Sequence, residues 1–154
     1  MSVLLVASVV MLFVRVGASS FGYSDSPLSR YKESGNSFQS GATADEFGKV
    51  QTLNDRNFGD AVLRSREVVL VSFWAEWARP SKREKPILEA LAADYAGQVK
   101  IGRLNVDENP RVTNEYQVRG IPTTLLFKRG VVVESVVGLV PEDKLKGIID
   151  KHLK

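Results

Sequence analysis

The chain has 154 residues, 44% of them apolar, and a formal charge of +3, which suits one soluble domain and is too weakly basic to indicate a nucleic-acid partner. It has no cysteine and a single histidine, His152, so disulfide bonds, a thiolate nucleophile and a metal site of sulfur or several imidazoles are excluded. No segment has the pattern of a carboxylate cation loop, and we expect neither a metal nor a cofactor.

Residues 1–18 are dominated by an apolar run from Val3 to Val14, which is as long as a signal-peptide core and shorter than the roughly 20 residues of a membrane span. The small residues at 16–18 could form a signal-peptide cleavage site, although the run is not preceded by the lysine or arginine that a signal peptide normally has. We expect a signal peptide or membrane-anchoring segment, with any membrane association through residues 3–15. The alternatives are an anchor ending at Arg15, an organelle transit peptide, and a misassigned start codon, with an organelle or the cytoplasm as the other locations.

Residues 19–48 consist mainly of serine, glycine and scattered polar residues, with no sustained apolar period of 2 or 3.6. The aromatic residues in this segment are isolated from one another and form no core pattern. We predict a flexible linker, followed by a folded domain over residues 49–154.

The first elements of that domain alternate between strand and helix patterns. A short apolar stretch at 50–53 precedes Asn54, which is placed to cap a helix. Residues 68–74 are apolar, rich in β-branched side chains and too few for a helix, which predicts a central strand covered on both faces. From Pro80 onward, apolar residues at positions 87, 91 and 95 predict an amphipathic helix.

The second half of the domain continues the alternation. Residues 99–106 form another strand pattern, and Pro110 suits the first turn of the next helix. Two β-rich runs, 123–127 and 131–137, flank a short turn with a glycine and predict a hairpin. Pro141 then starts a helix with one apolar stripe. This order predicts an α/β fold with a central mixed β-sheet flanked by helices on both faces.

One segment of the predicted domain resembles a known family. Residues 73–82 read FWAEWARPSK and are similar to the active-site segment of thioredoxins, where Trp-Cys-Gly-Pro-Cys-Lys occupies the last six positions. The similarity continues through 86–88, 104–110, 120–130 and 137–138. It therefore covers roughly residues 49–154 and implies the thioredoxin fold, with protein-disulfide reduction as the activity of the family.

The differences from the family lie where its chemistry resides. Ala78 and Ser81 replace the two cysteines, and Ser72 stands where thioredoxins have a buried aspartate. Disulfide exchange needs a thiolate that attacks sulfur and a second thiol that resolves the mixed disulfide, so no residue is assigned a catalytic role. Loss of the acid together with both cysteines favours natural degeneration, and a single-thiol ancestor with an engineered change at Ala78 is the alternative.

The resemblance also implies a surface that needs no sulfur. In thioredoxins a flat apolar rim holds target peptides, and the residue before a cis-proline pairs with the peptide backbone. The resemblance implies that the bond between Ile121 and Pro122 is cis. It also implies a rim that consists of Trp77, Ala78, Arg79, Pro80, Ile121, Pro122 and Gly138. The alternative is that these residues are retained only for the fold.

Several charged residues near this rim are open to interpretation. Arg79, Lys82 and Arg83 lie at the start of a helix, which favours an acidic partner, with Glu84 as a partial offset; a solvated charged face is the alternative. Without an acid at Ser72, Arg103 is expected to extend outward or to pair with Asp107 or Glu76, and a solvent-directed arginine is the simpler alternative.

These observations favour a redox-inactive thioredoxin-like protein that binds polypeptides noncovalently, as a holdase-like, chaperone-like helper or as an assembly subunit. A thiol-disulfide oxidoreductase whose active-site cysteines were replaced in this chain is the first alternative. A structural module held at a membrane by its N-terminus is the second. The sequence does not indicate an oligomeric state.

Overall fold

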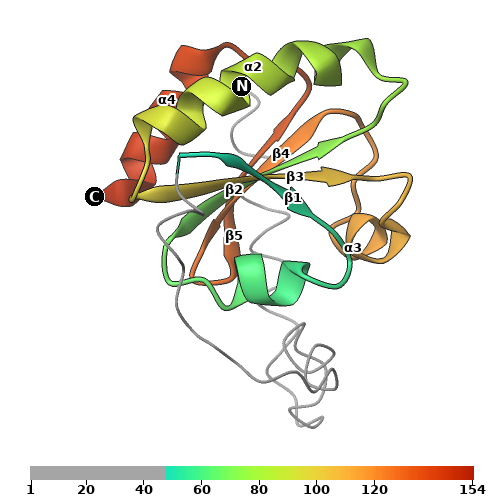
Figure 1. The fold of residues 1–154 in the computed structure, drawn as a ribbon, viewed down its shortest axis with the longest axis horizontal. Coiled ribbons are helices and arrows are strands. Elements are labelled where there is room, and N and C mark those ends of the chain that lie inside the picture. The colour runs from blue at the N-terminus through green and yellow to red at the C-terminus, as the bar shows by residue number, and fades with distance from the viewer. Residues whose placement is uncertain (1–47) are drawn as a thin grey trace, which may run out of the picture. The chain divides into compact units, whose positions relative to one another are not determined.

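The computed structural model describes residues 48–154, and the predicted N-terminal segment and nearly all of the predicted linker lie outside them. A five-stranded sheet, in the order β1-β3-β2-β4-β5, forms the centre of this region (Figure 1). The strands are β1 (Val50–Leu53), β2 (Val68–Trp74), β3 (Val99–Asn105), β4 (Thr123–Lys128) and β5 (Val131–Val137). Strands β1, β3 and β2 are parallel neighbours, whereas β4 runs antiparallel to β2 and β5. This is the mixed sheet that the sequence predicts.

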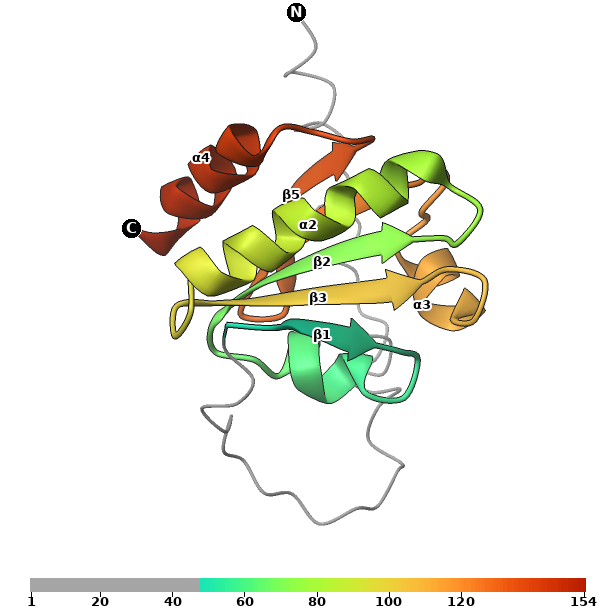
Figure 2. The same cartoon turned by 45° about the horizontal axis from the view of Figure 1, so that its top comes forward.

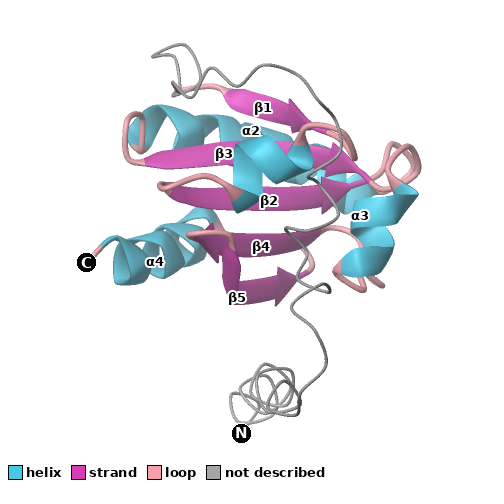
Figure 3. Cartoon of the chain, turned by 90° about the horizontal axis from the view of Figure 1, so that it is seen from below, coloured by secondary structure: helices cyan, strands magenta, loops and turns pink. Residues whose placement is uncertain are grey.

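Helices cover both faces of the sheet. Helix α2 (Arg79–Asp94) and helix α4 (Glu142–Leu153) lie on one face, as Figure 2 shows. On the other face lie a short π-helix, η3 (Gly59–Leu63), and helix α3 (Pro110–Glu115). In Figure 3 η3 is in front of β3 and β2, and α3 is beside the ends of the strands. The predicted cap at Asn54 closes the turn before η3, because its Oδ1 accepts hydrogen bonds from the backbone N–H groups of Arg56 and Asn57.

Each face of the sheet has its own apolar core, because alternate side chains of a strand point to opposite faces. Beneath α2 and α4 the core is mainly aliphatic, with Tyr95 as its aromatic member, and its fully buried residues include Leu70, Leu88, Leu91, Ile101 and Ile149. The opposite core is aromatic: Phe127 lies 5.7 Å from Phe58 and 5.3 Å from Tyr116 between ring centroids, in edge-on geometry.

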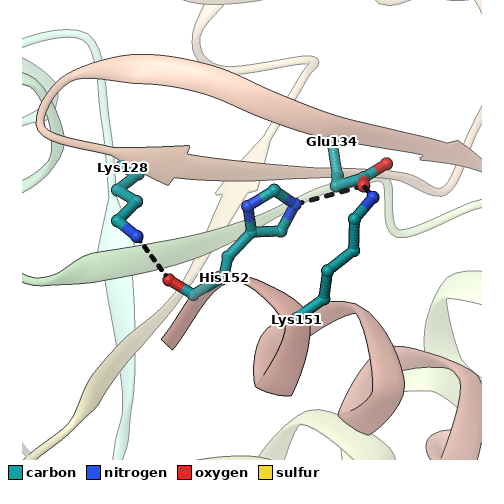
Figure 4. A network of polar contacts seen from close by, with 4 residues as sticks. All are labelled: Lys128, Glu134, Lys151 and His152. Carbon is teal, nitrogen blue, oxygen red and sulfur yellow. Dashed lines mark hydrogen bonds and ion pairs between the residues drawn. The ribbon is translucent and has the colours of Figure 1, made fainter. Parts of the chain in front are cut away.

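A polar network fixes the last turns of α4 to the β4–β5 hairpin (Figure 4). Glu134 on β5 accepts from Lys151 Nζ at 2.6 Å and lies 3.1 Å from His152 Nε2, and Lys128 Nζ on β4 donates to the carbonyl of His152 at 2.7 Å. The lysine hydrogen bond and the histidine lower the pKa of Glu134. His152 is thus a structural residue of this helix end.

The β4–β5 turn depends on a glycine. Gly130 has a φ of +75°, and a Cβ atom at this position would lie 2.4 Å from the carbonyl oxygen of Leu63. The turn can therefore approach the end of η3 only without a side chain at this residue.

Within residues 48–154, no helix is both long and apolar enough to cross a lipid bilayer.

Candidate functional site

The segment between β2 and α2, residues 75–81, contains the two positions that stand in place of the family's cysteines. Ala78 is the N-cap of α2, is 5% exposed, and its N–H donates to the carbonyl of Ala75 at 3.2 Å. Ser81 is fully buried, and its Oγ has no hydrogen-bond partner within the described region. A methyl group and a buried hydroxyl without a base cannot attack a disulfide sulfur or an acyl carbon.

Trp77 is the most exposed large apolar side chain of this segment. It is 69% exposed, and its Nε1 donates to Asp107 Oδ2, which is 3.0 Å away in the loop after β3. Because the hydrogen bond restrains the indole, the ring presents apolar surface to solvent without the full rotational freedom of a surface side chain.

The sheet register brings a second loop to the same edge. Phe73, near the end of β2, pairs with Thr123 at the start of β4, and Thr123 pairs with Val137 at the end of β5. The peptide bond between Ile121 and Pro122 is cis, and Pro122 O accepts from the N–H of Gly138 at 2.7 Å. The residues predicted for the rim therefore lie at the same end of the strands, where β2 ends and β4 begins.

These predicted residues differ in how much surface they present. Trp77, Arg79 and Pro80 are exposed, and Ile121 and Gly138 are half-buried. Ala78 and Pro122 are buried, so they can shape the rim but offer little side-chain surface to a partner.

Sequence reasoning missed one member of the surface, Val137. This side chain is 68% exposed, and its Cγ1 lies only 3.0 Å from where a Cβ on Gly120 would be, so it lies against the loop before Pro122. Its position directly before Gly138, at the outward-facing end of the last strand, was the signal that could have indicated it. We define the rim as Trp77, Arg79, Pro80, Ile121, Val137 and Gly138.

Positive charge lies beside the rim on the first turns of α2. Lys82 forms a salt bridge of 2.9 Å with Glu76, whereas Arg79 and Arg83 are exposed and make no ion pair with any residue of 48–154. Glu84, which was expected to offset this charge in part, is fully buried and does not pair with these cations. Two cations therefore remain uncompensated on the first turns of α2.

The buried Glu84 carboxyl lies against Ser72, the position where the family has its aspartate. Ser72 Oγ donates to Glu84 Oε2 at 2.5 Å, and Thr124 Oγ1 donates to Oε1 at 2.9 Å. Burial raises the pKa of Glu84 above its ordinary value, although both hydroxyls and Arg103 act against this rise. Replacement of the aspartate has therefore not removed a buried acid from this part of the protein, since α2 supplies one instead.

Arg103 on β3 has partners that the sequence did not indicate. Its Nη2 donates to the carbonyl of Ser81 at 3.2 Å, and its guanidinium lies 4.3 Å from the ring centroid of Trp74. No salt bridge joins it to Asp107 or Glu76 within the described residues. The side chain is half-buried, burial lowers its pKa, and its Nε has no hydrogen-bond partner there.

The raised pKa of Glu84 leads to a prediction about stability. A carboxyl with a higher pKa in the folded state than in the unfolded state binds more protons when folded, so stability falls as pH rises from about 4.5 through the folded-state pKa. In Glu84→Gln this loss is absent. Urea denaturation between pH 4.5 and 8 should show the wild type losing stability relative to the variant as pH rises, and parallel profiles would contradict the prediction.

Comparison with known proteins agrees with this geometry. The family model described as thioredoxin matches residues 49–151. The chain is 43% identical to "Thioredoxin" of Chlorobaculum thiosulfatiphilum over 106 residues, which are 69% of this chain and 98% of that protein. It is 44% identical to "Thioredoxin 1" of Synechococcus elongatus, over 66% of this chain and 94% of that protein. It is 41% identical to "Thioredoxin M-type, chloroplastic" of Spinacia oleracea, over 68% of this chain and 58% of that protein.

An α/β protein with this sheet order, a loop with a cis-proline and a turn between β2 and α2 at one sheet edge has the architecture that the resemblance implied. The chain belongs to the thioredoxin family. It does so without a cysteine at any of its 154 positions.

Proposed function

We propose that this protein binds extended polypeptide segments noncovalently through the rim and performs no thiol-disulfide exchange. The observation that supports this most directly is Trp77, an indole 69% exposed and hydrogen-bonded to Asp107 beside a turn that has lost both thiols. Holding a large apolar side chain in solvent is unfavourable unless a partner covers it. A polypeptide can use this surface and the backbone groups near Ile121 without forming a covalent bond.

The charges around the rim support a preference for acidic segments. Arg79 and Arg83 are exposed and lack an ion pair within residues 48–154, and Lys82 is already paired with Glu76. Carboxylates of a bound segment would satisfy these guanidinium groups and accelerate association. Such a protein would act as a holdase-like helper for unfolded chains or as a subunit that positions a partner in an assembly.

Removal of the indole tests the proposal. Trp77→Ala should weaken binding of a reduced, carboxymethylated unfolded protein by at least about tenfold, because aromatic anchors at the centre of an interface contribute much of its affinity. Isothermal titration calorimetry on the full chain measures the effect. If the wild type binds no unfolded or acidic polypeptide at high micromolar concentration, the proposal is wrong.

Strand β5 provides a matched pair of controls. Val137 and Val131 are the same residue type at opposite ends of the strand and are 68% and 64% exposed. We expect Val137→Ser to weaken binding and Val131→Ser to leave it unchanged, because only Val137 lies at the rim. Equal effects of the two substitutions would indicate nonspecific apolar adhesion instead of binding at the rim.

A further inference from the structure

The buried carboxyl of Glu84 connects the two segments that form the rim, the start of α2 and the loop that contains Pro122. Glu84 lies on α2, whose first turn provides Arg79 and Pro80, and its Oε1 accepts from Thr124, which follows Pro122 by two residues on β4. Its Oε2 accepts from Ser72 on the central strand β2. One side chain therefore fixes the start of α2 relative to the cis-proline loop.

Two hydrogen-bond donors without an acceptor are buried beside this connection. Ser81 Oγ lies one helical turn before Glu84, and Arg103 Nε is on a guanidinium whose field acts on the carboxyl. Buried donors almost always have partners, so these two groups are available to an acceptor that comes within reach. An ionised carboxylate at Glu84 is the acceptor of matching charge.

We propose that protonation of Glu84 regulates the rim: the neutral carboxyl maintains the peptide-binding arrangement, and its ionisation lowers affinity for polypeptides. The inference rests on the proposed function. In the neutral carboxyl one oxygen carries the proton and donates it to the hydroxyl of Ser72 or Thr124, which then accepts. When Glu84 releases this proton to water, both hydroxyls donate to the carboxylate, and the buried charge attracts Arg103 and the Ser81 hydroxyl. Arg103 then leaves the carbonyl of Ser81 and the ring of Trp74, and the first turn of α2 loses its present anchor.

The charges around Glu84 are consistent with this response. Strands β2 and β4 present only the neutral hydroxyls of Ser72 and Thr124, and β3 presents Arg103. The carboxylates of Glu76 and Glu89 act on Arg103 and not directly on Glu84. Arg103 is therefore the charged group within residues 48–154 that responds to ionisation of the carboxyl.

The test follows affinity against pH with a probe that does not itself titrate. An acetylated, amidated twelve-residue peptide of valine, leucine, serine and glycine is titrated into the full chain between pH 5 and 8 by calorimetry. Wild-type affinity should fall about three- to tenfold with rising pH, as expected for a population shift between two states.

Two variants serve as controls for this pH dependence. In Glu84→Gln, the affinity should not change with pH. His152→Gln should keep the wild-type slope, which excludes the single histidine as the titrating group. Equal slopes in the wild type and in Glu84→Gln would overturn the proposal.

A second measurement needs no ligand. The indole N–H resonance of Trp77 should shift with pH in the wild type, with the same midpoint as the carboxyl carbon resonance of Glu84, and this shift should be absent in Glu84→Gln and reduced in Thr124→Val. If the peptide does not bind but these resonances titrate together, the proposed function is wrong and the coupling of Glu84 to the rim stands. If the Trp77 resonance does not follow Glu84, the regulation proposed here is wrong whatever the peptide does.

Discussion

Phe127→Ala is expected to destabilise the domain by about 3–5 kcal/mol, the range for deleting a fully buried aromatic side chain. Phe127 is 0% exposed and contacts the rings of Phe58 and Tyr116 edge-on, so the substitution leaves a cavity that these rings cannot fill without moving off their contacts with each other. A loss of this size is a large part of the roughly 5–15 kcal/mol that stabilises an ordinary domain. Urea denaturation followed by circular dichroism measures it.

Val131→Ala is the matched control for this measurement. Val131 lies just across the turn of the same hairpin but is 64% exposed, so its truncation should change the free energy of unfolding by less than about 0.5 kcal/mol. If both substitutions cost the same, the aromatic cluster does not stabilise the sheet as described.

Gly130→Ala should cost about 3 kcal/mol, from two causes that a second glycine can separate. A residue with a Cβ in the left-handed region loses about 1–2 kcal/mol, and at Gly130 the new methyl group would also meet the backbone oxygen of Leu63 at 2.4 Å. Gly97 has a similar φ of +81°, but apart from its two chain neighbours no residue has an atom within 4 Å of the position that a methyl group on it would take.

Gly97→Ala should therefore cost only about 1–2 kcal/mol, the conformational part of the effect. The difference between the two variants measures the contact with Leu63. If Gly97→Ala is as destabilising as Gly130→Ala, the close approach of the hairpin to η3 adds nothing to the loss of unfolding free energy at Gly130. Thermal or urea unfolding of both variants under the same conditions decides between these results.

The fold could be predicted because local patterns and the family resemblance agreed. The apolar run of β2 is buried along almost its whole length, and the two valine-rich and threonine-rich runs form the predicted hairpin. The mixed sheet with helices on both faces follows from this order of elements. The sequence predicts a helix at η3, but its π geometry has no sequence signal that we can identify.

The site was only partly predictable. Trp77 and the cis-proline loop could be placed by resemblance, because their surroundings in sequence are similar to those of the family. The burial of Glu84 was not predicted, since the run Lys82-Arg83-Glu84-Lys85 has the composition of a solvated helix face. Its spacing from Ser81 and Leu88, three and four residues, was the signal that it lies on the buried stripe. Hydroxyl partners from two strands make that burial tolerable, and only the sheet register brings them together.

Arg103 shows the same limit. Its partners could not be predicted, because the ring of Trp74 and the carbonyl of Ser81 come from other elements. A carbonyl oxygen and an aromatic face also leave no charge signature in a sequence, so a search for carboxylates finds the wrong partners.

Strand β5 lies at the margin of the sheet and has five valines among its seven residues, a composition that invites strand-to-strand aggregation. Its pairing with β4 is irregular, since Leu126 faces Glu134 and Phe127 faces Val132, so that Val133 is an extra residue in the ladder. Such an extra residue twists the strand and interrupts the regular row of backbone donors and acceptors with which a strand of a second molecule would pair. The irregularity therefore disfavours pairing of this valine-rich edge strand with the same strand of a second molecule.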